Sequence, residues 1–394
     1  MPEALRIAYV TSSVLPSERA NVIQSLETAK SLAVSGADVD FFCIKADANI
    51  TEKGVRAWAE SIHGQTFPFQ FRCITNISVN GRFRTSLSIP ALLHKVSSTG
   101  SYDLYYVRNC YLFFVLSLLG KQTVFEQHQF RFYRNRALNA IVQRLTLFGS
   151  KMRANLLFVC ISEELRRRWT ALGVPSPKTV TAHDAVDMGL FTPMMESSEA
   201  KRITGAPEDA VLVTYMGSLY DDRAISDIVW MASKLPQAAF RIIGGPEHER
   251  EKLASAASEK NILNVQFLPR VDRRSVSRHL FASDILLFTM NEQTITFDIC
   301  SPLKIFEYMA AGRIIVAPDL PSIREVLKPA FSFFYEFPER DRLVEKVKEA
   351  IEAVQAGRLK AMGEQARRHV ELNHTWDLRV RQILDALAGN GAAS

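Results

Sequence analysis

The sequence predicts an α/β protein with two doubly wound parallel sheets, each in its own domain, which face each other across a central cleft. Three observations predict this fold class. Short apolar runs recur along the whole chain of 394 residues, helical patterns separate most of them, and the length exceeds what one core usually serves. Buried strands joined by helices favour parallel pairing. Ligands of such sheets bind beyond the carboxyl ends of the strands, so we expect the site in the cleft.

The first half opens with a pattern typical of a strand, a loop and a helix. Residues 5–10 ("LRIAYV") predict a buried strand and residues 11–21 a loop. Apolar residues then recur at helical spacing from Val22 to Ala33, Gly36 ends the helix, and a second strand follows. The strand candidates after the helix are residues 37–44, 69–74, 102–108, 122–128 and 155–162.

The second half repeats this pattern from residue 210. Its strand candidates are residues 210–217, 240–245, 264–269, 284–289, 313–317 and 331–337. A polar, turn-rich stretch at residues 183–193 separates the two series, and helices follow from about residue 339. We therefore expect one domain at residues 1–190 and another at residues 191–372.

Composition excludes several classes of protein. A hydrophobic content of 47% with 23% charged residues is typical of globular proteins. The longest apolar run, residues 110–120, is about half of the ~20 residues that a membrane-spanning helix needs. The N-terminus does not resemble a signal peptide, and the five cysteines form no C-x-x-C pair, so we expect a cytoplasmic protein with reduced thiols. No histidine has the spacing of a metal site, so we expect no bound metal.

Basic residues are concentrated in the first half. Residues 1–185 hold 22 Lys and Arg against 13 Asp and Glu, whereas the remainder holds 26 against 29. Residues 61–102 and 127–162 contain no acid, and in the second stretch basic residues alternate with aromatic and aliphatic ones. Such a segment could contact an anionic membrane or a polyanionic acceptor, or could be a solvated basic face. No nucleic-acid-binding motif accompanies the charge, so we expect no nucleic-acid partner.

The segment "CSPLKIFEYMAAG" (300–312) predicts a short helix from Pro302 to Ala311. Ser301 is a suitable N-cap, proline suits the first helical position, and Gly312 suits the position after the C-cap.

This helix carries two charges in an apolar setting. The N–H groups of Leu303 and Lys304 would bind phosphate oxygens at the helix start, and the lysine adds a full charge. Glu307, one turn on, could accept hydrogen bonds from a ribose diol. The alternative is a surface Lys–Glu pair, which contributes only a few tenths of a kcal/mol.

The chain resembles the retaining GT-B glycosyltransferases of the group 1, or GT4, type. In the second half, the resemblance is carried by "YMGSLYDDRAI", "FRIIGGPE", "NVQFLPRV", "ASDILLF" and "SPLKIFEYMAAGRIIVAPDLPSIREVL". The first half adds "LETAKSLAVSGADVDFF", "VFEQH", "CISEEL" and "TAHDAVDMGLF". Residues 373–394 resemble the final helix of the family, which crosses back onto the first domain.

The resemblance implies sugar transfer from a nucleotide-diphosphate-sugar donor, with retention at the anomeric carbon and without a metal or other cofactor. Arg223 matches a cationic residue that stabilises the departing diphosphate together with Lys304, and Asp221 or Asp222 could instead pair with this arginine. The backbone of Gly217 and Ser218 would approach the same diphosphate.

Two further residues match positions of the family motifs. Glu307 matches the glutamate that binds the nucleotide ribose, and His128 matches the histidine that faces the donor sugar. Glu126, two residues before it, is expected to orient this histidine or to contact the acceptor. Two positions depart from the family pattern: Ile299 stands where many members carry a second glutamate, and Ser218 replaces a frequent arginine.

The expected function is therefore glycosyl transfer to a carbohydrate or lipid-linked acceptor in the biosynthesis of cell-surface polysaccharide or glycolipid. The basic first domain would contact an anionic membrane, which places the protein on the cytoplasmic face of the inner membrane. The alternatives are a nucleotide-sugar epimerase of the same architecture and a non-catalytic protein that binds sugar nucleotides.

Overall fold

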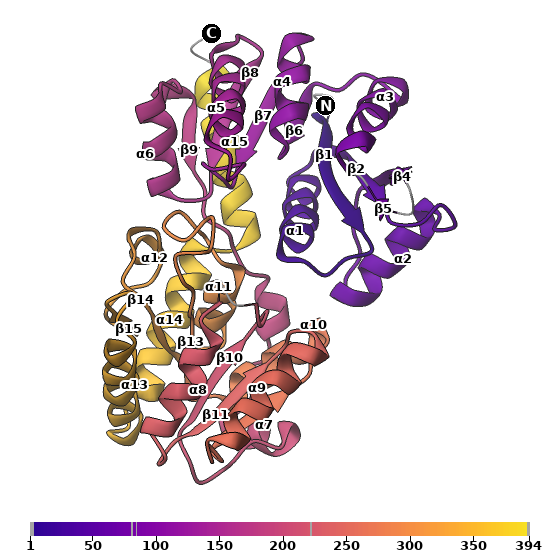
Figure 1. Ribbon diagram of the computed structural model, residues 1–394. Coiled ribbons are helices and arrows are strands. Elements are labelled where there is room, and N and C mark those ends of the chain that lie inside the picture. Colours follow the sequence, from indigo (N-terminus) through magenta and orange to yellow (C-terminus); the bar gives the residue numbers. More distant parts are fainter. Residues whose placement is uncertain (1–3, 80–81, 84, 221–222, 392–394) are drawn as a thin grey trace. The chain divides into compact units, whose positions relative to one another are not determined.

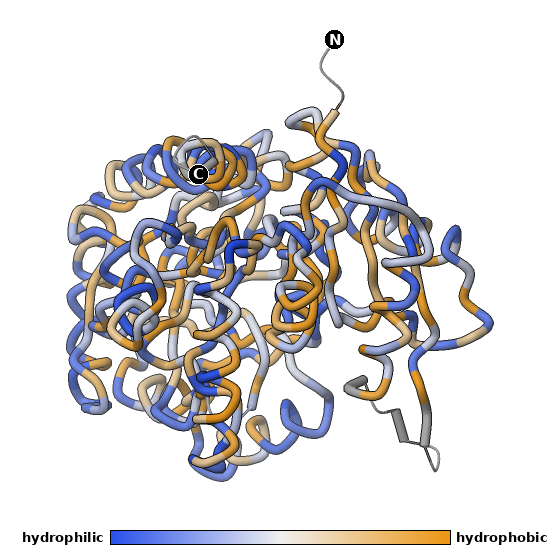
Figure 2. The backbone as a smooth tube through the Cα atoms, turned by 90° about the horizontal axis from the view of Figure 1, so that it is seen from above, coloured by the Kyte–Doolittle hydropathy of each residue, from blue (hydrophilic) through white to orange (hydrophobic). Residues whose placement is uncertain are grey.

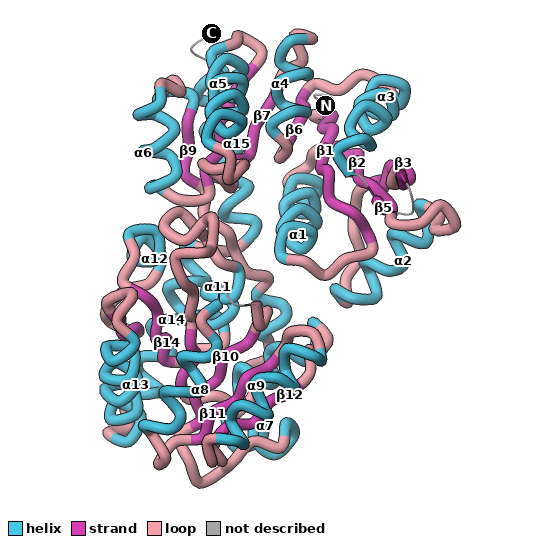
Figure 3. The backbone as a smooth tube through the Cα atoms, in the orientation of Figure 1, coloured by secondary structure: helices cyan, strands magenta, loops and turns pink. Residues whose placement is uncertain are grey.

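The computed structural model describes residues 4–79, 82–83, 85–220 and 223–391 (Figure 1). The chain divides into two compact units. Unit 1 comprises residues 1–184 and 376–394, and unit 2 comprises residues 185–375. Figure 3 shows in each unit a set of strands flanked by helices, the layered α/β arrangement that the sequence predicts.

Unit 1 contains a seven-stranded sheet in the order β3-β2-β1-β6-β7-β8-β9, in which every neighbouring pair is parallel. Its strands are β1 (Arg6–Leu15), β2 (Asp38–Lys45), β3 (Gln70–Thr75), β6 (Leu104–Val107), β7 (Thr123–Gln127), β8 (Asn155–Cys160) and β9 (Thr179–Thr181). Its helices are α1 (Ala20–Val34), α2 (Glu52–His63), α3 (Ile89–Thr99), α4 (Cys110–Leu118), α5 (Arg136–Lys151), α6 (Glu163–Leu172) and α15 (Trp376–Gly391). A small antiparallel pair, β4 (Ser78–Val79) and β5 (Arg82–Phe83), and two 3₁₀ helices, η1 (Thr85–Ser88) and η2 (Ser176–Lys178), complete the described elements.

The first strand is longer than the sequence predicts. The prediction of a loop from residue 11 is wrong for its first five residues, because β1 resumes its pairing with β2 after an irregularity between Val10 and Val14. Val14 then pairs with Ile44, and Leu15 is fully buried. Polar residues in the middle of the strand hide this continuation from a hydrophobicity pattern.

Unit 2 contains a six-stranded parallel sheet in the order β12-β11-β10-β13-β14-β15. Its strands are β10 (Leu212–Met216), β11 (Ala239–Ile243), β12 (Val265–Leu268), β13 (Ile285–Leu287), β14 (Ile314–Pro318) and β15 (Ser332–Tyr335). The 3₁₀ helix η3 (Met188–Phe191) precedes its helices. They are α7 (Ser197–Thr204), α8 (Ile225–Lys234), α9 (Glu247–Glu259), α10 (Arg273–Ala282), α11 (Leu303–Ala310), α12 (Pro321–Val326), α13 (Arg340–Gln355) and α14 (Leu359–Asn373).

Each unit has its own hydrophobic core. In unit 1 the ring of Tyr9 stacks between those of Phe41 and Tyr106, with ring centroids 5.3 and 5.0 Å apart. Figure 2 shows hydrophobic and hydrophilic segments alternating along the helices, as amphipathic helices that cover a sheet require. The cores therefore form from the inner faces of helices and from strands that are apolar on both faces.

The strand order reverses once in each sheet. In unit 1 the reversal lies between β1 and β6, and in unit 2 between β10 and β13. Open parallel sheets bind ligands beyond the carboxyl ends of the strands at such reversals. We therefore expect functional side chains at the carboxyl ends of the strands that flank these two reversals.

Candidate functional site

The carboxyl ends of β10 and β11 are packed so closely that the position of Gly244 has no room for a side chain. Gly217 has φ +155° and donates its N–H to the carbonyl of Ile243 over 2.9 Å. Gly244 has φ +124°, and a Cβ atom there would lie 2.1 Å from the carbonyl oxygen of Gly217. The ends of β10 and β11 thus expose backbone at close quarters, which is the property that a phosphate-binding loop needs.

Lys304 lies directly against this backbone. Its Nζ atom is 3.2 Å from the hydroxyl of Tyr215 and 4.3 Å from the centroid of the same ring. A Cβ atom on Gly217 would come within 2.5 Å of this Nζ. Tyr215 also donates its hydroxyl proton to the carbonyl of Ser218 over 2.8 Å. The structure therefore brings together three predicted site residues, Gly217, Ser218 and Lys304.

Helix α11 starts one residue later than the sequence predicts. Its N-cap is Pro302, with ψ 126°, and its first residue is Leu303, so the prediction of Ser301 as the N-cap is wrong. The first backbone hydrogen bond runs from Ile305 to the carbonyl of Pro302 over 3.0 Å. The N–H of Leu303 precedes this bond and belongs to the set that helix starts offer to anions. Gly312 has φ +64° and ends the helix as predicted.

Glu307 lies one turn after Lys304 and pairs with Arg273, the first residue of α10. The Nη1 atom of Arg273 is 3.3 Å from Oε1 of Glu307, and the side chains are 9% and 18% exposed, respectively. Burial raises the pKa of Glu307, and the charges of Arg273 and Lys304 oppose the rise. The ionised carboxylate is the form that accepts hydrogen bonds from two hydroxyl groups, and the two cations limit the cost of burying it.

Arg223 lies in the loop that joins β10 to α8. Its carbonyl accepts a hydrogen bond from the hydroxyl of Thr289, just after β13, over 2.7 Å. The next residue, Ala224, has φ +53°, a left-handed conformation that turns the chain into the helix. The charge of Arg223 also acts on Cys300: burial raises the pKa of that thiol to about 12, and the arginine opposes the rise.

The charge of Arg223 thus acts on the segment that precedes α11, where Ser301 is buried. Asp221 and Asp222, which the sequence suggested as its partners, lie outside the described residues.

Ile299 is 1% exposed and belongs to the buried hydrophobic residues. The position at which the family resemblance leads us to expect a second glutamate is therefore part of the core here.

In unit 1 the carboxylate of Glu126 is fully buried at the end of β7. Its Oε1 accepts a hydrogen bond from Nε2 of Gln24 over 2.8 Å, and Nε2 of His128 lies 2.6 Å from the same oxygen. Its Oε2 accepts a hydrogen bond from the hydroxyl of Tyr106 and lies 3.1 Å from Nη2 of Arg379. Burial raises the pKa of Glu126, but Arg379 and His128 outweigh it and hold the pKa well below its usual range.

His128 stands at the edge of this network with its side chain 21% exposed. Nη2 of Arg108 lies 3.0 Å from the imidazole Nε2. Burial and the charge of Arg108 lower the pKa of His128 to about 4, although Glu126 opposes this shift. The imidazole is therefore neutral at physiological pH, and the predicted neighbours Glu126 and His128 are in direct contact.

Two residues complete the network from other parts of the chain. Arg379, on α15, donates its Nε–H to the carbonyl of His183 over 2.9 Å and has a side chain 2% exposed. Asp184 accepts a hydrogen bond from Nε2 of Gln24 over 2.6 Å. Burial raises the pKa of Asp184 to about 7, and Arg379 opposes the rise. The network thus contains one ionised carboxylate and one whose charge changes near neutral pH.

The sequence alone did not identify several residues that contact Glu307 in unit 2 or Glu126 and His128 in unit 1. Arg108 could have been found from its place, because it directly follows β6, the neighbour of β7 in the sheet. Gln24, Arg273 and Arg379 lie on helices and carried no local signal.

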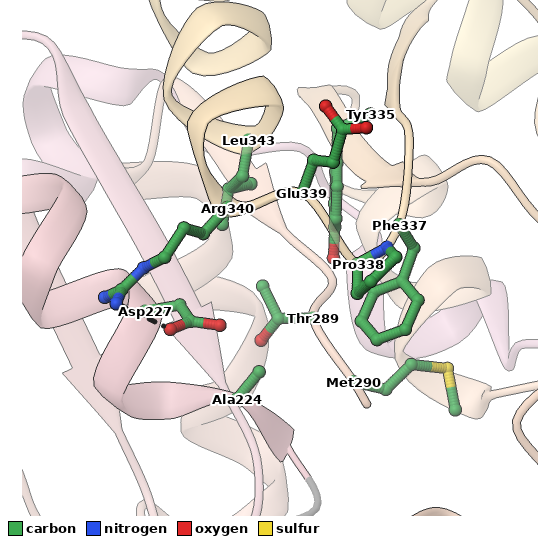
Figure 4. Close-up of a pocket in the computed structure, with 10 residues that line it drawn as sticks. All are labelled: Ala224, Asp227, Thr289, Met290, Tyr335, Phe337, Pro338, Glu339, Arg340 and Leu343. Atoms are coloured by element: carbon green, nitrogen blue, oxygen red, sulfur yellow. Dashed lines mark ion pairs between the residues drawn. The ribbon is translucent and has the colours of Figure 1, made fainter. Parts of the chain in front are cut away.

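A small pocket of unit 2 lies near the start of α8 but includes none of the predicted site residues. Figure 4 shows Arg340 and Asp227 facing each other at one side of it, where Nη2 and Oδ1 are 3.3 Å apart. Phe337, Pro338 and Met290 line the other side.

Within the part of the chain that the structure describes, no group of three or more His, Cys, Asp or Glu could hold a metal ion. No helix of the described ranges is long and apolar enough to cross a membrane.

Comparisons with known proteins agree with the resemblance seen in the sequence. Residues 196–369 match the family model described as "Glycosyl transferases group 1". TuaH of Bacillus subtilis, named as a candidate teichuronic acid biosynthesis glycosyltransferase, is 22% identical over 207 residues, which are 52% of this chain and 50% of that protein. This chain therefore aligns with about half the length of that curated relative.

Solved structures match the chain along almost its whole length. Sucrose-phosphate synthase from Thermosynechococcus elongatus has a TM-score of 0.77 at 14% identity, covering 99% of this chain and 100% of that one. HepE from Anabaena, solved with UDP, has a TM-score of 0.73 at 17% identity, covering 98% and 100%. At such low identity the likeness shows the fold, and the predicted GT-B fold is confirmed.

Proposed function

We propose that this chain, whose residues 196–369 match the model of the group 1 glycosyl transferases, transfers a sugar from a nucleotide-diphosphate-sugar donor to a carbohydrate or lipid-linked acceptor. The observation that carries the proposal is the position of Lys304. Its ammonium group lies against the glycine-rich end of β10, and one turn along the same helix Glu307 is paired with Arg273. A diphosphate and a ribose diol are the ligands that such a pair of neighbouring groups fits.

The chemical demand of the reaction is to stabilise the diphosphate as its bond to the anomeric carbon breaks. Negative charge grows on the leaving oxygens, and fixed cations and N–H groups placed there lower the barrier. We assign this role to Lys304, Arg223 and the N–H of Leu303. The hydrogen bond of the Arg223 carbonyl with Thr289, just after β13, and the action of its charge on Cys300 support its assignment.

Glu307 would hold the ribose of the nucleotide. Its carboxylate remains partly exposed, so its oxygens can accept hydrogen bonds from two hydroxyl groups. The backbone of Gly217 and Ser218 would approach the diphosphate, and the buried Ser301 would support the segment that leads into α11. HepE, of the same fold, binds UDP and UDP-glucose, which supports a nucleotide sugar as the donor.

His128 would face the donor sugar, and Glu126 would orient it. The contact of 2.6 Å between the two side chains supports this division of roles. We further propose that the anomeric configuration is retained and that no metal is needed, because arginine, lysine and a helix start supply the positive charge. Proton NMR of the product, which distinguishes the two anomers, tests retention. Turnover in the presence of EDTA tests whether a metal is needed.

The acceptor and the location of the protein are part of the same proposal. We place the chain in cell-surface polysaccharide or glycolipid biosynthesis, on the cytoplasmic face of the inner membrane. The surplus of basic residues in residues 1–185 supports contact with anionic lipid.

Release of nucleoside diphosphate from a panel of nucleotide sugars tests the proposed reaction. A thermal-shift screen first selects the donor, because a ligand stabilises the native state by mass action. Glu307→Ala and Arg223→Ala should each lower turnover by at least about 100-fold, a loss on the scale seen for removed charge-stabilising donors. Glu364→Ala, an exposed glutamate on α14, is the matched control. Wild-type turnover in both site variants would refute the site assignment.

The same assay separates the alternatives. A binding protein would show tight nucleotide binding but no release of nucleoside diphosphate from any donor. An epimerase would convert the donor sugar without an acceptor. The family match of residues 196–369 favours the transferase over both.

A further inference from the structure

The outer face of helix α5 carries large apolar side chains. The buried residues of the helix are Val142, Thr146, Gly149 and Ser150, of which three are small or polar. On the exposed side, Leu138, Ile141 and Phe148 have 42%, 53% and 55% of their surface exposed. These residues are three and seven positions apart, so they form one stripe along the helix.

Helix α4 extends this apolar stripe. The two helices pack together, and Figure 1 shows them near each other in unit 1. The rings of Phe114 on α4 and Phe148 on α5 are 6.3 Å apart. Leu118 and Leu119, at the end of α4, are 53% and 61% exposed. The exposed apolar residues of both helices thus form one surface, which we call the α4–α5 surface.

Seven exposed cations lie on helices α4 and α5 or in the segments that flank them in the sequence, and the one acid among them, Glu126, is fully buried. They are the exposed residues Lys121, Arg131, Arg134, Arg136, Arg144, Lys151 and Arg153. No carboxylate occurs at residues 104–125 or 127–162. Among the described residues, none of the seven forms an ion pair with a carboxylate, whereas Arg166 and Arg168 on the next helix pair with Glu163 and Glu164.

We propose that the α4–α5 surface docks on an anionic lipid bilayer, with the apolar stripe inserted among the headgroups and the cations around it bound to lipid phosphates. The inference rests on the proposed function and specifies which residues make its membrane contact. Apolar side chains flanked by Lys and Arg are the pattern of interfacial membrane helices. The cations draw the surface to anionic lipid, and burial of the stripe holds it there.

The apolar residues favour a bilayer over the other occupants. A soluble polyanion would engage the cations but would leave Leu138, Ile141 and Phe148 in water. A second copy of the chain would bring seven cations against seven, and like charges repel. Only a surface that is both anionic and apolar complements the whole patch.

Sedimentation of the full chain with vesicles tests the proposal. The probes are vesicles of phosphatidylcholine alone and of phosphatidylcholine with phosphatidylglycerol, at low and high salt. We expect binding only to the anionic vesicles. Neutralisation of two cations in Arg144→Gln/Lys151→Gln should weaken binding about 25-fold, since each cation near such a surface contributes about fivefold.

The apolar stripe is tested by Leu138→Gln/Ile141→Gln, which should weaken binding at least about tenfold. Both positions are exposed, so the substitutions leave the core intact. The matched controls are Arg368→Gln/Lys360→Gln for charge and Leu263→Gln/Leu372→Gln for apolar surface, all exposed residues of unit 2. Both control pairs should bind vesicles as the wild type does.

Three results would overturn the proposal. These are equal binding to neutral vesicles, wild-type binding of both stripe and cation variants, and tighter binding to soluble heparin with no effect of the stripe variant. A dimer in size-exclusion chromatography that the stripe variant abolishes would assign the surface to a second copy instead. Release of nucleoside diphosphate from soluble donor is measured on the same samples, so loss of the proposed reaction and loss of docking are distinguished.

Discussion

Nε2 of His128 lies 2.6 Å from a carboxylate oxygen of Glu126. A carboxylate only accepts hydrogen bonds, so we infer from this short contact that Nε2 carries the proton and donates it to Glu126. The nearby guanidinium of Arg108 disfavours a second proton on the ring. His128 is therefore held as a neutral imidazole with Nδ1 left to accept a hydrogen bond, for example from a sugar hydroxyl.

This tautomer can be observed directly. Nitrogen NMR of histidine-labelled protein should show His128 in the neutral Nε2–H form from pH 8 down to pH 5, because its pKa is lowered to about 4. The signals are assigned by their loss in His128→Gln. His248, whose side chain is 76% exposed, serves as a solvent-exposed reference. An imidazolium at pH 6, or a proton on Nδ1, would contradict the assignment.

Removal of the cation that neutralises Glu126 should destabilise unit 1. Arg379→Gln leaves a buried carboxylate without its closest guanidinium, and the loss of one partner of a buried ion pair typically costs about 3 kcal/mol or more. Denaturant unfolding measures the change. Arg381→Gln, an exposed position on the same helix, should stay within about 0.5 kcal/mol of the wild type. An equally small effect of Arg379→Gln would show that the other hydrogen-bond donors to Glu126 are enough to stabilise its buried carboxylate.

Asp184 should make the stability of the chain fall as pH rises towards neutrality. Its pKa is raised from 3.8 to about 7 by burial, so the folded chain binds more protons than the unfolded chain between these values. The stability that this group contributes is present at low pH and is lost with a slope of up to about 1.4 kcal/mol per pH unit.

Below pH 6.5 the titration of His128 changes the free energy of unfolding in the opposite direction. A comparison of the wild type with Asp184→Asn therefore isolates the contribution of Asp184. The free energy of unfolding of Asp184→Asn relative to the wild type should grow from pH 4 to pH 7. Urea unfolding at each pH measures it. A difference that does not change with pH would mean that Asp184 stays ionised in the folded chain.

Gly217→Ala should weaken the binding of nucleoside diphosphates. The new Cβ would lie 2.5 Å from Nζ of Lys304, so the ammonium group must move away from the end of β10. We expect at least a tenfold loss of affinity, about 1.4 kcal/mol, by isothermal titration with the nucleotide found in the thermal-shift screen. Gly357 also has a positive φ, of 73°, but a Cβ atom at this position would lie more than 4 Å from the surrounding atoms, so Gly357→Ala is the matched control. It controls for backbone strain and should leave the affinity unchanged.

The sheets and the contact between Glu126 and His128 could be predicted because their signals are local. Apolar runs mark the strands, and residues two apart on a strand lie on the same face. The pairing of Glu126 with Arg379 could not be predicted, because it depends on how the last helix packs 253 positions away. The extension of β1 through Val14 was missed for another reason: strand pairing, rather than hydrophobicity, maintains the strand there.

The chain leaves unit 1 after Asp184 and returns to it at Trp376, so unit 2 is an insertion within unit 1. A gene fragment that ends at residue 184 would lack Val380 and Ile383, two residues of the core of unit 1. Production of unit 1 alone therefore requires a short linker that joins residue 184 to residue 376, or a separately supplied peptide of residues 376–394. Unit 2, by contrast, is one continuous segment, residues 185–375, so its expression needs no such linker.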